Sequence, residues 1–292
     1  MRPGSISAQF VGPPGRRIFV LQREPAVAAR GGTSVLVVPP FGEEMNKSRW
    51  LMSGTAEQLC QSGITVFMPD FFGTGDSEGD FRDAEVDLWV DDLDTACRYA
   101  AALGRPVRAI VAVRLGCAVA VAAARRGVLP EVAASAWWQP VLEGKRYLTR
   151  FLRLRVAAAG MRGGAQETVE SLLQRSADGE TLEVAGYELS PSLVRGLEGL
   201  GVDSLPSQVG VLHWFEIVRE EGAAPPLPST RFIDRARAGG AHVSLTNVAG
   251  EPFWASTEIV RLPRLIELTA GALGTALSAP QDRSSPDSRA KA

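Results

Sequence analysis

One stretch near the middle of the chain decides the fold, Ala112-Val113-Arg114-Leu115-Gly116. Small residues at its two ends are typical of a sharp strand-to-helix turn that exposes a nucleophilic serine above a parallel sheet. Residues 107–113 are apolar except for Arg108 and predict a strand, and the alanine-rich residues 117–126 predict a helix. The central residue, however, is Arg114, whose side chain has five hydrogen-bond donors, no acceptor and a permanent charge. The pattern of small residues therefore predicts the turn of a serine hydrolase, whereas the residue at its centre cannot act as the nucleophile.

Strand-like and helix-like segments alternate over the rest of the chain. The expected strands are residues 16–23, 33–38, 65–69, 107–113, 132–138, 209–218 and 242–248. The expected helices are residues 48–62, with Ser48 as N-cap, 85–103, 117–126 and 255–273. This alternation predicts an α/β protein with a mostly parallel central sheet and helices on both faces. In such sheets, ligand sites lie beyond the carboxyl ends of the strands.

The segment 142–207 interrupts the alternation. It begins basic and amphipathic, becomes rich in glycine and then reads as helical again. We expect a helical cap inserted over the strand ends, and the alternative is a further set of surface helices. The core domain then consists of residues 1–141 and 208–275. Residues 276–292, rich in serine, proline and charge, are expected to be a disordered tail.

Composition restricts the classes of partner. The chain has 292 residues, of which 45% are hydrophobic and 22% charged, and its formal net charge is -2. This charge gives no reason to expect nucleic acid or an anionic membrane as the main partner. The sequence contains no apolar run of about 20 residues, so we expect no membrane span. Three widely spaced cysteines without a signal peptide favour a reducing cytoplasm. We expect no metal, because no second acidic cluster lies near Glu43 and Glu44 in the sequence, and we also expect no cofactor.

Several motifs resemble those of known proteins. The string Asp70-Phe71-Phe72-Gly73-Thr74-Gly75-Asp76-Ser77 is similar to the D-x-x-G-x-G-x-S loop of the α/β-hydrolase superfamily. The resemblance covers about residues 16–273. Four further strings resemble one subgroup, the exosortase A system-associated hydrolase 2 group, found beside bacterial exopolysaccharide and protein-sorting loci. They are Pro39-Pro40-Phe41-Gly42-Glu43-Glu44-Met45-Asn46-Lys47-Ser48-Arg49, Arg114-Leu115-Gly116, Trp138-Gln139-Pro140-Val141 and Pro252-Phe253-Trp254. The resemblance implies an α/β-hydrolase fold and a bacterial setting, but the subgroup name does not establish an activity.

An acyl hydrolase needs a nucleophile, a base, an orienting acid and an oxyanion hole. The backbone N–H of Leu115 and that of Phe41 or Gly42 stand where oxyanion donors are expected. The nucleophile position carries Arg114, and the position of the superfamily's histidine carries Glu251 or Pro252, with the register left open.

No other side chains complete the set convincingly. His213 lies inside a predicted strand and His242 at the amino end of another, so both are interpreted as structural. Glu216, Glu220 and Glu221 follow or end the strand expected to precede the acid, where charged residues are usually only solvated.

Two interpretations of the elbow residues remain open. A buried guanidinium needs a partner, and Glu43, Glu44 and Glu251 are the candidates. Arg114 either forms an inert internal ion pair or presents a bidentate fork to a carboxylate or phosphate ligand. Cys117, in the first turn of the predicted helix, is an alternative nucleophile, although cysteines among alanines are usually core residues.

The sequence predicts a ligand pocket around Arg114. Its candidate catalytic residues are Arg114, Glu251 and Cys117, and its candidate ligand-binding residues are Glu43, Glu44, Asn46, Asp70, Trp138, Phe253 and Trp254. The leading hypothesis is a protein with a replaced triad that binds an acyl or anionic small molecule. The alternatives are an unconventional esterase or acyltransferase that uses Cys117, and a non-catalytic partner of a neighbouring hydrolase. A homodimer is a further partner state that the sequence leaves open.

Overall fold

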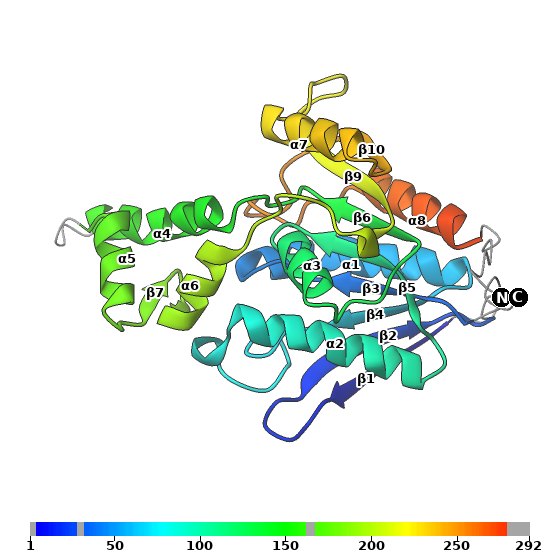
Figure 1. The fold of residues 1–292 in the computed structure, drawn as a ribbon, viewed down its shortest axis with the longest axis horizontal. Coiled ribbons are helices and arrows are strands. Elements are labelled where there is room, and N and C mark those ends of the chain that lie inside the picture. Colours follow the sequence, from blue (N-terminus) through cyan, green and yellow to red (C-terminus); the bar gives the residue numbers. More distant parts are fainter. Residues whose placement is uncertain (1–3, 28–31, 162–166, 279–292) are drawn as a thin grey trace, which may run out of the picture.

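A mostly parallel sheet of eight strands forms the centre of the molecule (Figure 1). The computed structural model describes residues 4–27, 32–161 and 167–278. The strands are β1 (Ser5–Val11), β2 (Ile18–Glu24), β3 (Ser34–Val38), β4 (Thr65–Pro69), β5 (Val107–Val113), β6 (Ala134–Trp138), β9 (Val211–Val218) and β10 (Val243–Ala249). Their order is β1-β2-β4-β3-β5-β6-β9-β10, and all pairs from β4 to β10 are parallel. The expected fold class is confirmed.

Each face of the sheet carries its own hydrophobic core. Leu36 and Val38 of β3 pack with α2 (Val86–Ala102) and α3 (Gly116–Arg125). Val35 and Val37 point to the other face and pack with α1 (Glu43–Gln61) and α8 (Pro263–Ser278). All four of these side chains are buried. Burial on both faces explains why this strand is continuously apolar rather than alternating.

Two helices have boundaries that differ from the sequence expectation by more than one residue. Helix α1 starts at Glu43, so Ser48 is not an N-cap but lies inside the helix, where its Oγ donates to the Glu44 carbonyl oxygen. The two glutamates of the first turn face the positive end of the helix dipole, which favours the earlier start. Helix α8 starts at Pro263 rather than at residue 255. It also continues to Ser278, three residues into the expected tail, and residues 279–292 lie outside the described residues.

The interrupting segment folds mainly as helices, drawn to the left in Figure 1. It contains α4 (Gly144–Met161), α5 (Val169–Ala177) and α6 (Pro191–Gly199). Between α5 and α6 lies a hairpin of β7 (Leu182–Val184) and β8 (Tyr187–Leu189), which the sequence pattern did not predict. Strand β1 and helix α7 (Leu227–Ala238) were not predicted either. Among the described residues, no helix is long and apolar enough to cross a bilayer.

Candidate functional site

Arg114 occupies the tight turn between β5 and α3. Its φ is 54°, in the left-handed region, and its N–H donates to the carbonyl oxygen of Trp138 at 3.0 Å. The turn presses Gly116 against the end of β3. A Cβ on Gly116 would lie 2.5 Å from the carbonyl oxygen of Pro39 and 2.7 Å from that of Val38, so only glycine fits. The small-residue pattern of the sequence thus corresponds to a real elbow.

The Arg114 guanidinium is held on three sides. Its Nε and Nη2 donate to the two carboxylate oxygens of Glu44 at 3.2 and 3.1 Å, and its Nη1 donates to the carbonyl oxygen of Gln139 at 3.0 Å. The Trp254 ring covers the group, with its centroid 4.5 Å from the guanidinium carbon. The side chains of Arg114 and Glu44 are only 11% and 15% exposed. A bidentate pair with so little exposure fixes the side chain at the turn.

Glu44 is therefore the partner of Arg114 among the three glutamates considered from sequence. Glu251 lies exposed in the loop after β10 and takes no part in this pair. Tyr147 of α4 is also affected by the pair. Burial, and to a smaller extent the charge of the Glu44 carboxylate, raise the pKa of its hydroxyl well above the ordinary value. The interrupting segment is thus in direct electrostatic contact with the elbow.

A cavity of about 270 Å³ opens beside the elbow. Its lining residues are Pro39, Pro40, Phe41, Gly42, Met45, Asn46, Phe71, Gly73, Thr74, Gly75, Phe81, Trp89, Leu115, Gly116, Val119, Gly186 and Tyr187. Five of them are aromatic, and none of these described lining residues carries a charge. Arg114 does not line the cavity, because its side chain is turned towards Glu44. The cavity is therefore an apolar, aromatic space at the low end of the usual size for small-molecule sites.

Three residues that line this space have backbone N–H groups without a hydrogen-bond partner among the described residues. Within the described part of the chain, the N–H groups of Phe41, Gly42 and Leu115 donate no hydrogen bond. Helices α1 and α3 both begin here, so two helix dipoles place positive potential at these amides. Unpaired donors in this arrangement suit an oxygen acceptor such as a carbonyl or a carboxylate.

The other predicted binding residues are scattered. Asn46 lines the cavity and donates to Glu43, which also accepts a hydrogen bond from the Tyr187 hydroxyl. Asp70 lies outside the cavity and pairs with Arg49. Three predicted aromatic residues, Trp138, Phe253 and Trp254, lie on the α1 and α8 side of the sheet; the first two are buried in that core. They do not form the cavity wall.

The aromatic part of the wall consists of five rings. Phe41 and Phe71 follow predicted strands, where sequence reasoning expects a pocket wall, whereas Phe81, Trp89 and Tyr187 were not singled out for this role. Phe41 makes edge contacts with Phe81 and Trp89, at ring-centroid distances of 5.7 and 5.9 Å. Tyr187 stacks edge-on against Phe81 at 4.8 Å. These rings come from a loop, a helix and the β7–β8 hairpin, so only tertiary packing brings them together.

Neither histidine lies at the elbow. The His213 ring contacts the Ser244 hydroxyl, and burial lowers the pKa of this histidine. His242 precedes β10 at the amino end of that strand. Glu216 is buried on β9, where one carboxylate oxygen accepts a hydrogen bond from Trp214, and burial raises its pKa. No described histidine therefore lines the cavity or contacts Arg114. The described residues also contain no group of three or more metal-ligating side chains.

Comparison with solved structures identifies the class of fold. The chain resembles Est1E from Butyrivibrio proteoclasticus, with a TM-score of 0.63, 14% identity, and coverage of 93% of this chain and 99% of that chain. It resembles a proline iminopeptidase from Mycobacterium smegmatis with a TM-score of 0.60, 17% identity and coverage of 92% and 98%. It also resembles an alpha-beta serine hydrolase homologue from Coxiella burnetii, with a TM-score of 0.54, 15% identity, and coverage of 91% of this chain and 97% of that chain. No family model and no curated protein matches the sequence. The protein has the α/β-hydrolase fold.

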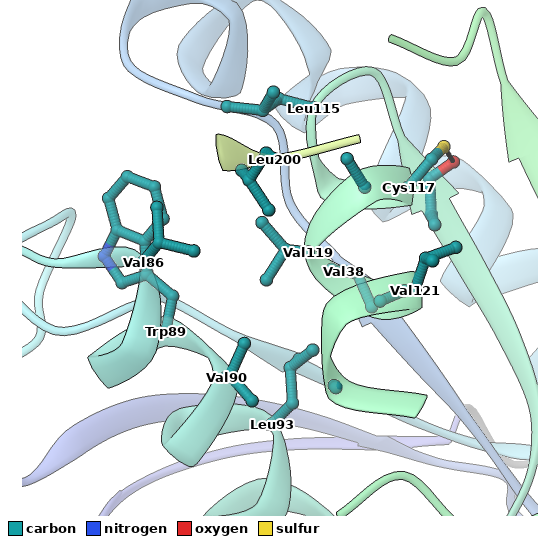
Figure 2. Packing of buried hydrophobic residues seen from close by; sticks show 14 of the residues in the cluster. Val38, Val86, Trp89, Val90, Leu93, Leu115, Cys117, Val119, Val121 and Leu200 are labelled. Atoms are coloured by element: carbon teal, nitrogen blue, oxygen red, sulfur yellow. Dashed lines mark hydrogen bonds between the residues drawn. The ribbon is translucent and has the colours of Figure 1, made fainter. Parts of the chain in front are cut away.

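Cys117 lies in the core rather than at the cavity. It is fully buried, and its Sγ donates a hydrogen bond to the carbonyl oxygen of Ala112 at 3.3 Å (Figure 2). Burial raises the pKa of its thiol well above the ordinary value, in spite of the nearby Arg114. A nucleophilic cysteine requires the opposite, an accessible thiolate.

We expect all three thiols to react slowly in the folded protein. Burial also raises the pKa of Cys60 to about 11 and that of Cys97 to about 12, so both stay protonated near neutral pH. The measurement is the reaction with dithionitrobenzoate at pH 8, before and after unfolding in guanidinium. A single fast thiol that disappears in Cys117→Ala would show instead that Cys117 is reactive.

A buried carboxyl supports the loop beside the cavity. Asp92 of α2 accepts hydrogen bonds from the Phe72 N–H at 2.7 Å and from Arg16 at 3.1 Å. Burial outweighs these bonds and raises the pKa of Asp92 from 3.8 to about 6. Between these values the folded protein keeps a proton that the unfolded chain has lost. The stabilising contribution of this group is thus complete below about pH 4 and is lost as the pH rises through about 6.

Asp92→Asn should therefore gain stability relative to the wild type as the pH rises. The gain between pH 4 and pH 7 should not exceed about 3 kcal/mol. Urea unfolding of both proteins at several pH values measures it. If the wild type instead becomes more stable relative to the variant as the pH rises, the hydrogen bonds from Arg16 and Phe72 outweigh burial and the pKa of Asp92 is lowered.

Proposed function

We propose that this protein binds a small acyl or aryl compound without hydrolysing it, and that its Ser-His-acid triad has been replaced. The ligand would place a carbonyl or carboxylate oxygen against the amides of Leu115, Phe41 and Gly42 and its apolar body among the aromatic rings. One observation carries this proposal: the elbow residue is turned away to Glu44, whereas an uncharged cavity opens on the amide side of the same turn.

The proposal changes the role that the sequence suggested for Arg114. A guanidinium that already serves Glu44, Gln139 and Trp254 has few donors left for a ligand. We therefore assign to Arg114 the structural role of joining the start of α1 to the elbow. The burial of Cys117 does not support the alternative in which this thiol is the nucleophile. The exosortase-associated setting, with a cytoplasmic location and an acyl-bearing or anionic ligand from exopolysaccharide metabolism, stays part of the proposal and rests on the sequence strings alone.

Ligand-observed NMR tests the binding. The probes are benzoate, cinnamate, butyrate and hexanoate, together with their methyl esters and with benzylamine as a cationic control. We expect saturable binding of at least one acid or ester and none of the amine, since the amides offer donors only. Preferential binding of the amine, or equal binding of every probe to a denatured sample, would contradict the proposal.

A further inference from the structure

Strand β1 forms one outer edge of the sheet. It pairs with β2 in an uninterrupted antiparallel register from Ser5↔Glu24 to Val11↔Ile18, and the sheet order places it at the end (Figure 1). Its seven residues read Ser-Ile-Ser-Ala-Gln-Phe-Val and include no charge and no proline. Soluble proteins usually protect such edges with charged residues, prolines or bulges, because the unpaired backbone groups invite another strand. This edge carries none of these protections.

The edge is also apolar on one face. Ile6, Ala8 and Phe10 alternate along the strand and share a face. The side chains of Ile6 and Phe10 are large, yet they are 57% and 54% exposed. The opposite edge of the sheet differs, since no large hydrophobic side chain of β10 is among the exposed ones in the described residues. Of the two edges of this eight-stranded sheet, as far as its residues are described, an unprotected backbone edge and exposed large apolar side chains coincide at β1.

We propose that β1 pairs with β1 of a second copy of this chain and forms a two-fold symmetric dimer with a continuous sheet. An antiparallel pair with its axis at Ala8 places Ile6 of each copy opposite Phe10 of the other. It also places Ser7 opposite Gln9, so the three central kinds of pair are apolar with apolar or polar with polar, and only the outer pair, Ser5 with Val11, is mixed. Pairs of an aromatic and a β-branched residue across an antiparallel ladder are favourable.

The occupant is a second copy because the strand is complementary to itself. A two-fold axis at Ala8 brings the side chains of one β1 close to those of the other, which would repel if the strand carried like charges, and β1 has no charge. Pairing through β1 uses none of the cavity wall, because no residue of Ser5–Val11 is among the described residues that line the cavity. The proposal is thus independent of the ligand that the cavity takes.

Sedimentation velocity of the purified protein over a wide concentration range tests this dimer. We expect a reversible monomer–dimer equilibrium in the wild type and a monomer at all concentrations in Ala8→Lys, which places two ammonium groups side by side at the axis. The double variant Ile6→Ser, Phe10→Ser should weaken dimerisation at least tenfold. Thr246→Lys on β10 is the matched control and should dimerise like the wild type.

Three results would overturn the proposal. They are a wild type that is monomeric throughout, a dimer that survives Ala8→Lys, and a dimer that Thr246→Lys abolishes. Far-ultraviolet circular dichroism and thermal melts of each variant distinguish loss of pairing from loss of folding, and Ala8 is exposed in the monomer, so the substitution leaves the core intact.

Discussion

Replacing Arg114 with alanine should destabilise the protein by about 3 kcal/mol, at the lower end of the range for removing one partner of a buried ion pair. The variant leaves the Glu44 carboxylate, only 15% exposed, near Tyr147 without its bidentate donor. It also removes the cation from the face of Trp254. Both residues at position 114 carry a Cβ, so the backbone strain at a φ of 54° is similar and cancels in the comparison. Urea unfolding measures the difference.

A surface pair provides the matched control for this experiment. Arg98 pairs with Asp94 one helical turn away, but its side chain is 79% exposed. Arg98→Ala should therefore change the free energy of unfolding by no more than about 0.5 kcal/mol. The double variant Arg114→Met, Glu44→Gln should recover most of the loss, since no uncompensated charge remains. If Arg114→Ala costs no more than Arg98→Ala, the pair does not hold the elbow.

Filling the mouth of the cavity should abolish ligand binding without unfolding the protein. Asn46 lines the cavity, is exposed, and lies in the first turns of α1, so Asn46→Trp adds a large ring at the entrance with little effect on the core. We expect at least a tenfold loss of affinity for whichever acid or ester the wild type binds, which corresponds to about 1.4 kcal/mol. Titration calorimetry with that probe gives the value.

The matched control places the same ring elsewhere on the same helix. Glu57 is exposed and does not line the cavity, so Glu57→Trp should bind the probe as the wild type does. Equal affinity in all three proteins would place the ligand outside the cavity and would remove the main support for the proposed function.

The fold could be predicted because the sequence encodes it locally. Buried strands such as β3 and β5 contain long apolar runs, and Gly116 is required by its close contact with the end of β3. Strand β1 was missed, although Ile6, Ala8 and Phe10 alternate, because its apolar face is not buried. Helix α1 was started too late because Ser48 resembles an N-cap, whereas the acidic first turn lies five residues earlier.

The site could be predicted only in part. The elbow and its amides follow from the motif, and the need of Arg114 for a carboxylate follows from the energetics of burial. The choice of Glu44 over Glu43 or Glu251 depends on the direction in which α1 leaves the sheet. The cavity wall depends on Tyr187, which follows Arg114 by more than seventy residues. Contacts between such distant segments leave no periodic trace in the sequence.

The central claim is that this fold binds an acyl or aryl ligand without cleaving it. Hydrolysis of p-nitrophenyl acetate, butyrate and octanoate by the wild type, with Arg114→Ala and Cys117→Ala alongside at a temperature where all three are folded, tests it most directly. We predict release of p-nitrophenol at the buffer rate in all three samples. Saturable turnover by the wild type that is lost in either variant would contradict the claim and establish a true active site at the elbow.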